Sequence, residues 1–222
     1  MCVSSGLLSA ADKPAVDVLE VESQKGLPDM SVQGRTRLPP LELDGTLTKE
    51  QQEAADSYVT TRGYQASRPY RILLRSPEVM RHLNGVGVHV THHSIFNGYL
   101  FEFACLIVAR DWGADYVWNV HQQDMERDGI FKAEIAAELR QGRRPSNMTD
   151  DEEIVYDFLI ELQRNKSVSD ATYKRALDRF TEQGIIDLIA IQGLYSILSM
   201  TANVARVPLP FAEAAPLPHF PD

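Results

Sequence analysis

Two side chains in this sequence are suited to moving protons, and both stand where the chain is largely apolar. Glu102 lies within the apolar run from residue 99 to 110, and His121 follows soon after the break at Gly113. A buried carboxylate must be paired, hydrogen-bonded or protonated, because losing its water is costly. A carboxylate beside a histidine orients the imidazole and stabilises its protonated form. Such a pair is a usable general acid and base.

Structural roles for the same residues stay open. An arginine or backbone donors could equally hold Glu102, and an inward-facing histidine such as His121 is more often a core residue than a catalyst. The Tyr116 hydroxyl could donate to a substrate carboxylate or enolate, or the ring could simply pack. Trp118 is expected to shape a wall of the site rather than to react.

Three further histidines, His89, His92 and His93, precede the apolar run by a few residues. With Glu102 and His121 they could supply a site of two histidines and one carboxylate, a type known for iron. Adjacent residues of a helix cannot face one point. We therefore expect His92 or His93 to line the pocket beside Glu102, and we predict no metal or other cofactor. The sequence contains neither a phosphate-cradling glycine loop nor a Gly-x-Ser-x-Gly elbow, which disfavours nucleotide cofactors and serine hydrolysis.

The segments that carry these residues have the spacing and start signals of helices. The run from 99 to 110 is apolar almost all round, which is typical of a helix buried on every side. Alternating valines at 86, 88 and 90 suggest a strand, but no partner strand follows, so a helix is preferred there. The expected helices are one after Thr46 or Thr48 that ends at Gly63, one from Pro77 interrupted at Gly85 and Gly87, then 99–110, 114–127 and 132–140, one capped by Thr149, one capped by Ser169, and 185–205 after a separation at Gly184. The sequence therefore predicts an all-α fold with short loops.

Length and composition limit the class of protein. The 222 residues fit a leader over residues 1–34, a helical domain over 35–207 and a proline-rich tail over 208–222. We expect the leader to be extended or disordered, and the tail to run extended over the surface or a neighbouring subunit. Apolar residues make up 44% of the chain, as in ordinary soluble proteins. The net charge of −9 argues against nucleic acid and anionic membrane surfaces as partners.

The number of cysteines and the nature of the apolar segments indicate the cellular compartment of the protein. Cys2 and Cys105 make neither a disulfide framework nor a zinc site, which fits a reducing environment. The first residues lack the basic region of a signal peptide. The late run 185–205 contains Asp187, Gln192 and Asn203, so a buried helix is expected rather than a membrane span. We therefore expect a soluble cytoplasmic protein.

A longer motif surrounds the two candidate residues. The stretch from Glu102 through Val-Ala-Arg-Asp-Trp-Gly-Ala-Asp-Tyr-Val-Trp-Asn-Val (residues 108–120) to His121, followed by Gly129, resembles the signature of the carboxymuconolactone decarboxylase-like family. That family shares its fold with alkyl hydroperoxidase D. The resemblance runs from about residue 35 to 208 and includes Tyr195. It implies an all-α, alkyl hydroperoxidase D-like bundle, no metal, and a homo-oligomer, often a trimer of dimers or smaller.

Two departures from the family pattern narrow the chemistry that the resemblance implies. The redox branch of the fold carries Cys-x-x-Cys, and alignment on Glu102 and His121 places those thiols at Ala114 and Val117, where both are absent. Cys105 has no partner thiol, so dithiol peroxidase chemistry is excluded. In the decarboxylase-like branch the position of Val117 is usually Glu, so the expected pocket has lost a polar group.

These features together predict a cofactor-independent lyase (a decarboxylase) or an isomerase that acts on a small carboxylated lactone or enolisable acid. The expected site comprises catalytic His121, Glu102 and Tyr116, with Trp118, His92, His93 and Val117 lining the substrate. Decarboxylation leaves a dienolate, to which His121 would donate or relay a proton. Two alternatives stay open. One is a non-catalytic oligomeric binding or assembly protein, which the Val117 departure favours. The other is a metal-dependent enzyme using His92 or His93 with His121 and Glu102.

Overall fold

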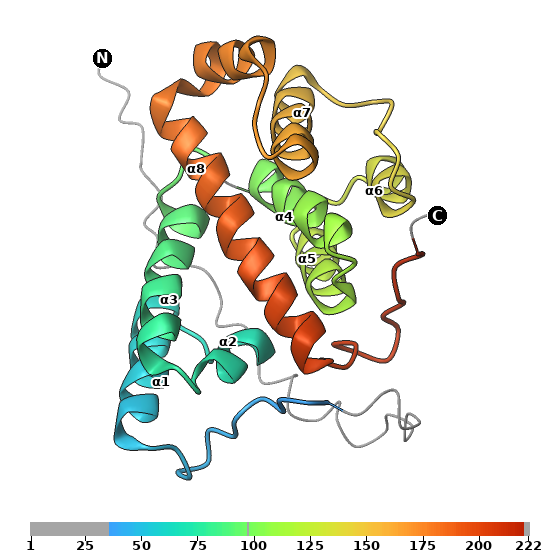
Figure 1. Cartoon of the computed structure of the whole chain (residues 1–222). Helices are drawn as coiled ribbons and strands as arrows, with labels where there is room; N and C mark the ends of the chain where they lie inside the picture. The colour runs from blue at the N-terminus through green and yellow to red at the C-terminus, as the bar shows by residue number, and fades with distance from the viewer. Residues whose placement is uncertain (1–35, 97, 220–222) are drawn as a thin grey trace, which may run out of the picture.

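The computed structural model describes residues 36–96 and 98–219, and all regular secondary structure within these ranges is helical (Figure 1). The all-α prediction is therefore confirmed. The predicted leader over residues 1–34 lies outside the described residues. The helices are α1 (Lys49–Arg62), α2 (Arg68–Leu73), α3 (Pro77–His92), α4 (Tyr99–Asp111), α5 (Asp115–Arg127), α6 (Ala133–Arg140), α7 (Asp150–Asn165) and α8 (Asp170–Ala205).

Helix α4 forms the centre of one half of the molecule. Its residues from Phe103 to Arg110 are all buried, because α5, α7 and α8 pack around it. Helices α1, α2 and α3 pack with one another on the other side of α8, so α8 joins the two halves (Figure 1). The expectation that an almost wholly apolar helix is buried on every side is confirmed for α4.

Side-chain caps fix several helix starts where the sequence predicted them. Thr48 and Thr149 each accept a hydrogen bond from the backbone N–H three residues later, and a glutamine or glutamate there returns a bond to the cap backbone. Ser169 caps α8 in the same way from its side chain. Gly63 ends α1 at φ 78°, a left-handed conformation that glycine adopts without strain.

Two glycines predicted to interrupt a helix do not. Helix α3 continues through Gly85 and Gly87 to His92. A Cβ at Gly87 would collide with the Arg62 guanidinium and lie 2.7 Å from the Tyr70 hydroxyl. This glycine therefore makes room for α1 and α2 rather than breaking the helix. The preference for a helix over a strand in this region is confirmed.

The predicted break at Gly184 is also misplaced. Gly184 lies inside α8, and the interruption falls at Thr181, whose backbone (φ 64°, ψ 177°) is not helical. A Cβ at Gly184 would lie 2.5 Å from the Phe180 Cβ and 2.6 Å from the Ile95 Cδ1, so close packing requires glycine there. The short helix α2 was not predicted at all, because its six residues are too few to show a periodic pattern.

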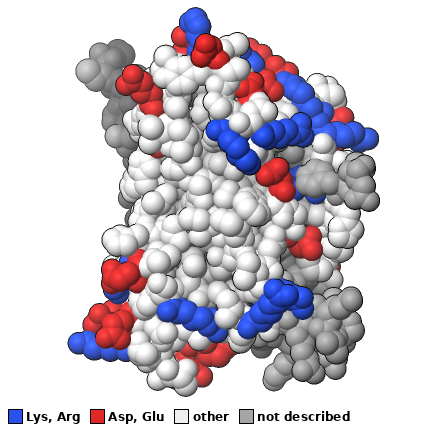
Figure 2. Space-filling model, viewed as in Figure 1, with Lys and Arg blue, Asp and Glu red and all other residues white. Residues whose placement is uncertain are grey.

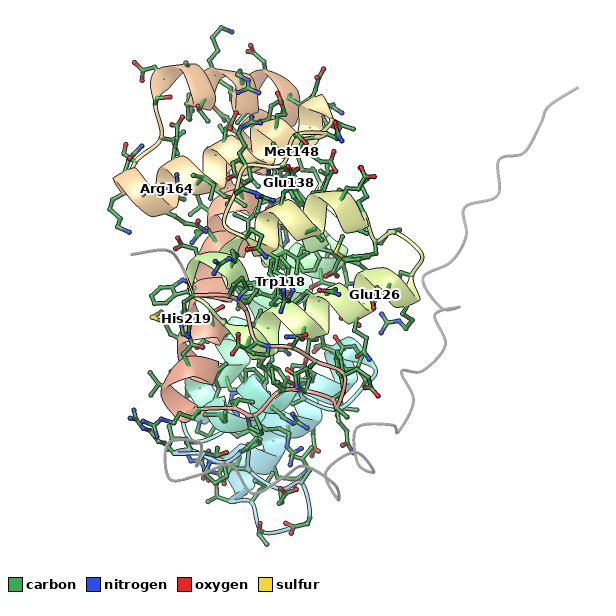
Figure 3. The ribbon with its side chains drawn as sticks, turned by 90° about the vertical axis from the view of Figure 1, so that its right-hand side faces the viewer. Trp118, Glu126, Glu138, Met148, Arg164 and His219 are labelled. Carbon is green, nitrogen blue, oxygen red and sulfur yellow. The ribbon has the colours of Figure 1, made fainter. Side chains whose placement is uncertain are left out.

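The proline-rich C-terminal segment lies along its own subunit. The Asn119 side chain donates to the Ala215 carbonyl at 2.9 Å and accepts from the Ala215 N–H at 3.2 Å. Asp115 accepts from the Leu217 N–H at 2.7 Å, and Arg140 donates to the carbonyl oxygens of residues 215 and 216. Figure 3 shows this segment crossing α5. Of the two predicted courses for the tail, the described part follows the chain's own surface.

Helix α8 is long and apolar enough to cross a membrane by length and composition, with a mean hydropathy of 1.6 over its most apolar window. Half of that window is buried inside the protein. The other half faces outward.

Candidate functional site

Glu102 and His121 meet across the contact between α4 and α5. The Nδ1 atom of His121 lies 2.6 Å from the Oε2 atom of Glu102, a short, charge-assisted hydrogen bond. The two side chains are only 13% and 16% exposed, so most of the pair is shielded from solvent. The structure thus brings together the two residues that the sequence singled out.

The turn between the helices explains this meeting. Gly113 adopts φ 54°, and the Ala114 N–H bonds the Ala109 carbonyl at 2.9 Å, which closes α4 with a tight reversal. Helix α5 therefore returns directly along α4, as expected of consecutive helices with a short connection. His121 then comes level with the first turn of α4, where Glu102 stands.

Tyr195 of α8 completes the inner wall of the site, and the sequence analysis did not assign it a role there. Its ring meets the His121 ring edge-on, with centroids 4.9 Å apart, and Phe101 lies edge-on to both rings. The Cys105 thiol is fully buried within hydrogen-bonding range of His121 and Tyr195. The sequence signal for Tyr195 was weak, because it is one of several polar side chains, with Asp187 and Ser199, on the buried face of α8.

The electrostatics of the cluster favour a protonated His121. Burial alone would lower the pKa of His121, but Cys105 and Glu102 raise it, and the net pKa lies well above the usual value. Burial raises the pKa of Cys105 to about 11, so its thiol is neutral at physiological pH. Glu102 is then the group that stabilises the imidazolium. Burial also raises the pKa of Tyr195 well above its usual value, which keeps this hydroxyl a donor.

Asp124 lies one helical turn beyond His121 and connects the pair to solvent. Its side chain is 30% exposed and accepts a hydrogen bond from Arg127 at 2.6 Å. Burial raises the pKa of Asp124, and His121 lowers it in part. Ligand atoms of Glu102, His121 and Asp124 all lie within 4.8 Å of one another, so these three residues could hold a metal ion. An ion would have to displace the Glu102–His121 bond.

The other residues predicted at the site lie around it or away from it. Val117 is buried one turn before His121 on the same face of α5. Trp118 is fully buried, its indole N–H bonds Gln122 at 3.0 Å, and the Arg140 guanidinium of α6 lies 5.9 Å from its ring centroid. It packs toward α6 rather than toward Glu102.

Tyr116 faces a different neighbour from His121. The Arg68 guanidinium of α2 lies 5.6 Å from the Tyr116 ring centroid. Five helical positions separate Tyr116 from His121, so the two side chains leave α5 in directions about 140° apart. Tyr195, not Tyr116, is therefore the tyrosine that contacts the imidazole.

The histidines predicted near Glu102 occupy another surface. His92 and His93 are exposed at the C-terminal end of α3, which packs against α1 and α8. Within the part of the chain that the structure describes, neither belongs to a group of potential metal ligands with Glu102 and His121. His89 bonds the buried carboxylate of Asp187 at 2.8 Å, which places this end of α3 about 12 Å along α8 from Tyr195.

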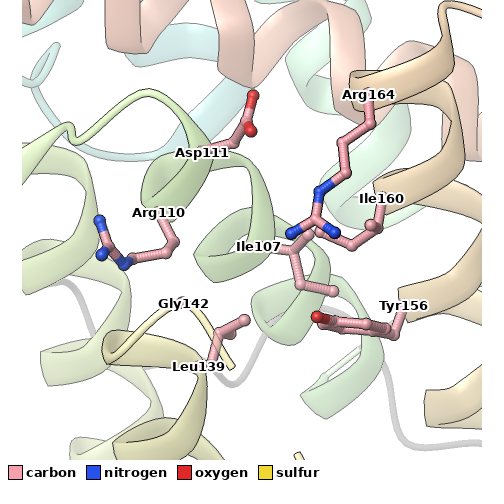
Figure 4. Close-up of a pocket in the computed structure, with 8 residues that line it drawn as sticks. All are labelled: Ile107, Arg110, Asp111, Leu139, Gly142, Tyr156, Ile160 and Arg164. Atoms are coloured by element: carbon pink, nitrogen blue, oxygen red, sulfur yellow. The ribbon is translucent and has the colours of Figure 1, made fainter. Parts of the chain in front are cut away.

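A cavity of about 20 Å³ lies between α4, α6 and α7, and Figure 4 shows Arg110 and Arg164 on opposite sides of it. This space holds one water molecule rather than a substrate. It is at the C-terminal end of α4, away from Glu102. A more open groove of about 410 Å³, lined by residues of α2 and α8, lies on another face of the protein.

The fold and the site define an all-α protein whose central helix carries a carboxylate bound to a histidine of the next helix. Comparison with known proteins adds no family assignment, because no protein-family model and no curated protein matches the chain.

Proposed function

We propose that the protein is a cofactor-independent lyase or isomerase of the carboxymuconolactone decarboxylase-like family, with an alkyl hydroperoxidase D-like fold. Its substrate would be a small carboxylated lactone or a related enolisable acid. One observation carries the proposal: the 2.6 Å bond between His121 Nδ1 and Glu102 Oε2, in a site that is nearly closed to water. Such a bond keeps a proton on the imidazole at neutral pH, where it can be donated in the reaction.

The proposed reaction is a decarboxylation with proton return. The substrate carboxylate leaves as CO₂, and the electron pair of the broken C–C bond delocalises onto the lactone carbonyl as a dienolate. The His121 imidazolium then donates its proton to the carbanionic carbon, and water restores that proton. Glu102 stabilises the imidazolium between turnovers. In an isomerisation, the neutral imidazole would first remove the proton that it later returns.

Tyr195 and Asp124 have supporting roles in this proposal. The Tyr195 ring lies edge-on to the imidazole at 4.9 Å and limits its rotation, so we assign Tyr195 as a positioning residue. Asp124 stands at the exposed side of the pair, where a proton can pass between His121 and solvent. Tyr116, which packs under Arg68, has no direct part in this scheme.

A second candidate is a non-catalytic protein in which the pair is structural. The observation that favours it is the near-complete burial of the imidazole, whose inner neighbours are Cys105 and Tyr195 rather than an open pocket. In that case the Glu102–His121 bond joins α4 to α5 and serves the stability of an oligomeric binding or assembly module.

The test measures turnover of a panel of carboxylated butenolides and β,γ-unsaturated acids, followed by CO₂ release and by deuterium incorporation from solvent. We expect His121→Gln to lower kcat/KM by about 100-fold or more, the usual contribution of a general acid. His89→Gln is the matched control, because His89 also bonds a carboxylate, at 2.8 Å, elsewhere in the fold. It should leave kcat/KM within a few-fold of the wild type.

Three outcomes separate the candidates. Turnover that survives His121→Gln contradicts the catalytic assignment. Equal losses in both variants indicate a general effect on folding and also contradict it. A wild type that binds and turns over no member of the panel, with a lower melting temperature in His121→Gln, supports the structural role.

A further inference from the structure

The outward face of α8 carries an apolar stripe that no part of residues 36–96 and 98–219 covers. Its members recur at alternating spacings of four and three residues, the heptad pattern of a helix that packs against a second helix. These seam residues are Ile186, Ala190, Gly193, Ile197, Met200 and Val204. Ile186 is 63% exposed and Val204 is 58% exposed, and Ile189, beside the seam, is 46% exposed. Large aliphatic side chains left this far in water at heptad spacing indicate a missing helix.

The exposed stripe of α8 itself carries no charged residue. Between Glu182 and Arg206 the sequence of α8 contains one ionisable carboxylate, Asp187, and that residue turns inward, where it is buried and bonded to His89. Figure 2 shows a broad uncharged band across the side on which α8 runs in front in Figure 1, with the charged residues gathered above and below it. A core without charges and a charged rim are typical of a protein interface.

The seam is complementary to itself when two copies run antiparallel. Pairing about a two-fold axis level with Tyr195 sets Gly193 opposite Ile197 of a second copy. The same register sets Ala190 opposite Met200, and Ile186 opposite Val204. Each small residue then faces a large one, which lets the side chains of one helix fit between those of the other. The opposite charges of Glu182 and Arg206, at the two ends of the seam, come together only in this orientation.

Gly193 has no role in its own subunit that would require glycine. A Cβ added there meets no atom within 4 Å, and the residue stands in the middle of a regular helix, where glycine is unfavourable relative to alanine. At Gly87 and Gly184, by contrast, neighbouring atoms of the same chain occupy the space that a Cβ would need. The open side of Gly193 admits the large side chain of a second helix.

The dimensions suit a stable interface. From Ile186 to Val204 the seam extends about 27 Å at 1.5 Å per residue, which is about five turns of helix. Its C-terminal end continues into the groove of about 410 Å³, where Leu38, Ile72 and Leu73 join Ile197, Met200 and Val204. A second copy of the chain would cover both surfaces at once.

We propose that α8 is a self-association surface, on which two copies of this chain pack seam to seam and antiparallel. In such a dimer each Glu102–His121 site lies on the side of α8 that faces away from the contact, because Tyr195 is on the buried side of α8. The contact needs no residue of the Glu102–His121 pair, so it is independent of the proposed activity.

Sedimentation velocity and light scattering on the full chain test this proposal. The wild type should have a mass that is an even multiple of 24.9 kDa at micromolar concentration. Gly193→Leu should halve that mass, because leucine fills the space reserved for Ile197 of the second copy. The variant should fold, since leucine favours helix over glycine and the new side chain meets open space in the subunit. Gly85→Leu is the matched control, because Gly85 is also an exposed helical glycine with open space around it. This variant should have the same mass in solution as the wild type.

Cysteine cross-linking tests the orientation. In a Cys2→Ser background treated with a mild disulfide-forming oxidant, the double variant Ile186→Cys, Val204→Cys should give a covalent dimer. Each single variant should not, because antiparallel packing keeps like positions about 27 Å apart. Cross-linking of the single variants would indicate parallel packing and overturn the proposal. So would a monomeric wild type, an unchanged mass in Gly193→Leu, or a monomer whose seam inserts into lipid vesicles.

Discussion

Replacing Glu102 with glutamine isolates the contribution of the carboxylate to the site. The substitution keeps the shape of the side chain but removes its charge, so the short bond to His121 Nδ1 loses its ionic character. The imidazole then remains in the same nearly buried position, between Tyr195 and Cys105, with the carboxylate of Asp124 but no longer that of Glu102 beside it. Its protonated form becomes less favourable.

The expected size of the effect follows from the geometry. A hydrogen bond to a charged group contributes about 1.5–3 kcal/mol, and one pKa unit corresponds to about 1.4 kcal/mol. The side chains of both partners are less than one fifth exposed, so solvent screens little of this contribution. We therefore expect the pKa of His121 to fall by about 1–2 units in Glu102→Gln. Below the ordinary imidazole pKa the variant should melt roughly 3–12 °C lower, at 2–4 °C per kcal/mol for a chain of this size.

The assay is a long-range ¹H–¹⁵N NMR titration of the imidazole nitrogens, with His121 assigned from the signal that disappears in His121→Gln. Glu78→Gln is the control, because it removes a carboxylate 3.8 Å from the exposed imidazole of His82. Exposed pairs contribute little, and Glu78 lies on α3 whereas His121 lies on α5, so this control should leave the His121 midpoint within about 0.3 units of the wild type. A His121 midpoint in Glu102→Gln within about 0.3 units of the wild type would refute the electrostatic reasoning.

Three further predictions concern the surroundings of the pair. Chemical denaturation should show the full stability advantage of the wild type over His121→Gln below the ordinary imidazole pKa of about 6.5. This difference in unfolding free energy should decline as pH rises through the elevated pKa of His121 in the folded state. A difference that grows with pH would contradict this. In a Cys2→Ser background, the native protein should show no thiol that reacts with a chromogenic disulfide reagent, and the denatured protein one, because Cys105 is buried with a pKa of about 11. Asn119→Ala should lose about 1–3 kcal/mol and release the C-terminal segment to limited proteolysis, since three hydrogen bonds of this side chain disappear; unchanged cleavage would show that the segment is held elsewhere.

Local sequence signals predicted most of the helices and the Glu102–His121 pair of the candidate site. Capping residues such as Thr48 and Thr149 act within one turn, so their effect is visible in the sequence. The Glu102–His121 contact was also within reach, because a tight turn at Gly113 forces two successive helices together. The predicted family, activity and oligomeric state remain predictions.

Contacts between residues far apart in the chain determine the features that the sequence did not predict. Tyr195 is far from His121 in sequence, and helical periodicity marks it only as buried, not as a neighbour of the imidazole. Glycine carries two meanings that periodicity does not separate. Gly113 turns the chain, whereas Gly184 makes room for Phe180 and Ile95 within a continuing helix. Only the tertiary contacts distinguish these cases, which is why the break in α8 was predicted at the wrong residue.

The buried thiol beside the imidazole bears directly on which chemistry the site can perform. A thiol within hydrogen-bonding range of a histidine is reactive when the imidazolium stabilises the thiolate. Here burial outweighs that stabilisation and raises the pKa of Cys105 to about 11, and the chain's other cysteine, Cys2, lies outside the described residues. Within this cluster the Cys105 thiol keeps its proton, and the imidazole of His121, whose pKa is raised well above its usual value, lies beside the carboxylates of Glu102 and Asp124. This arrangement favours the proposed proton transfer over thiol redox chemistry.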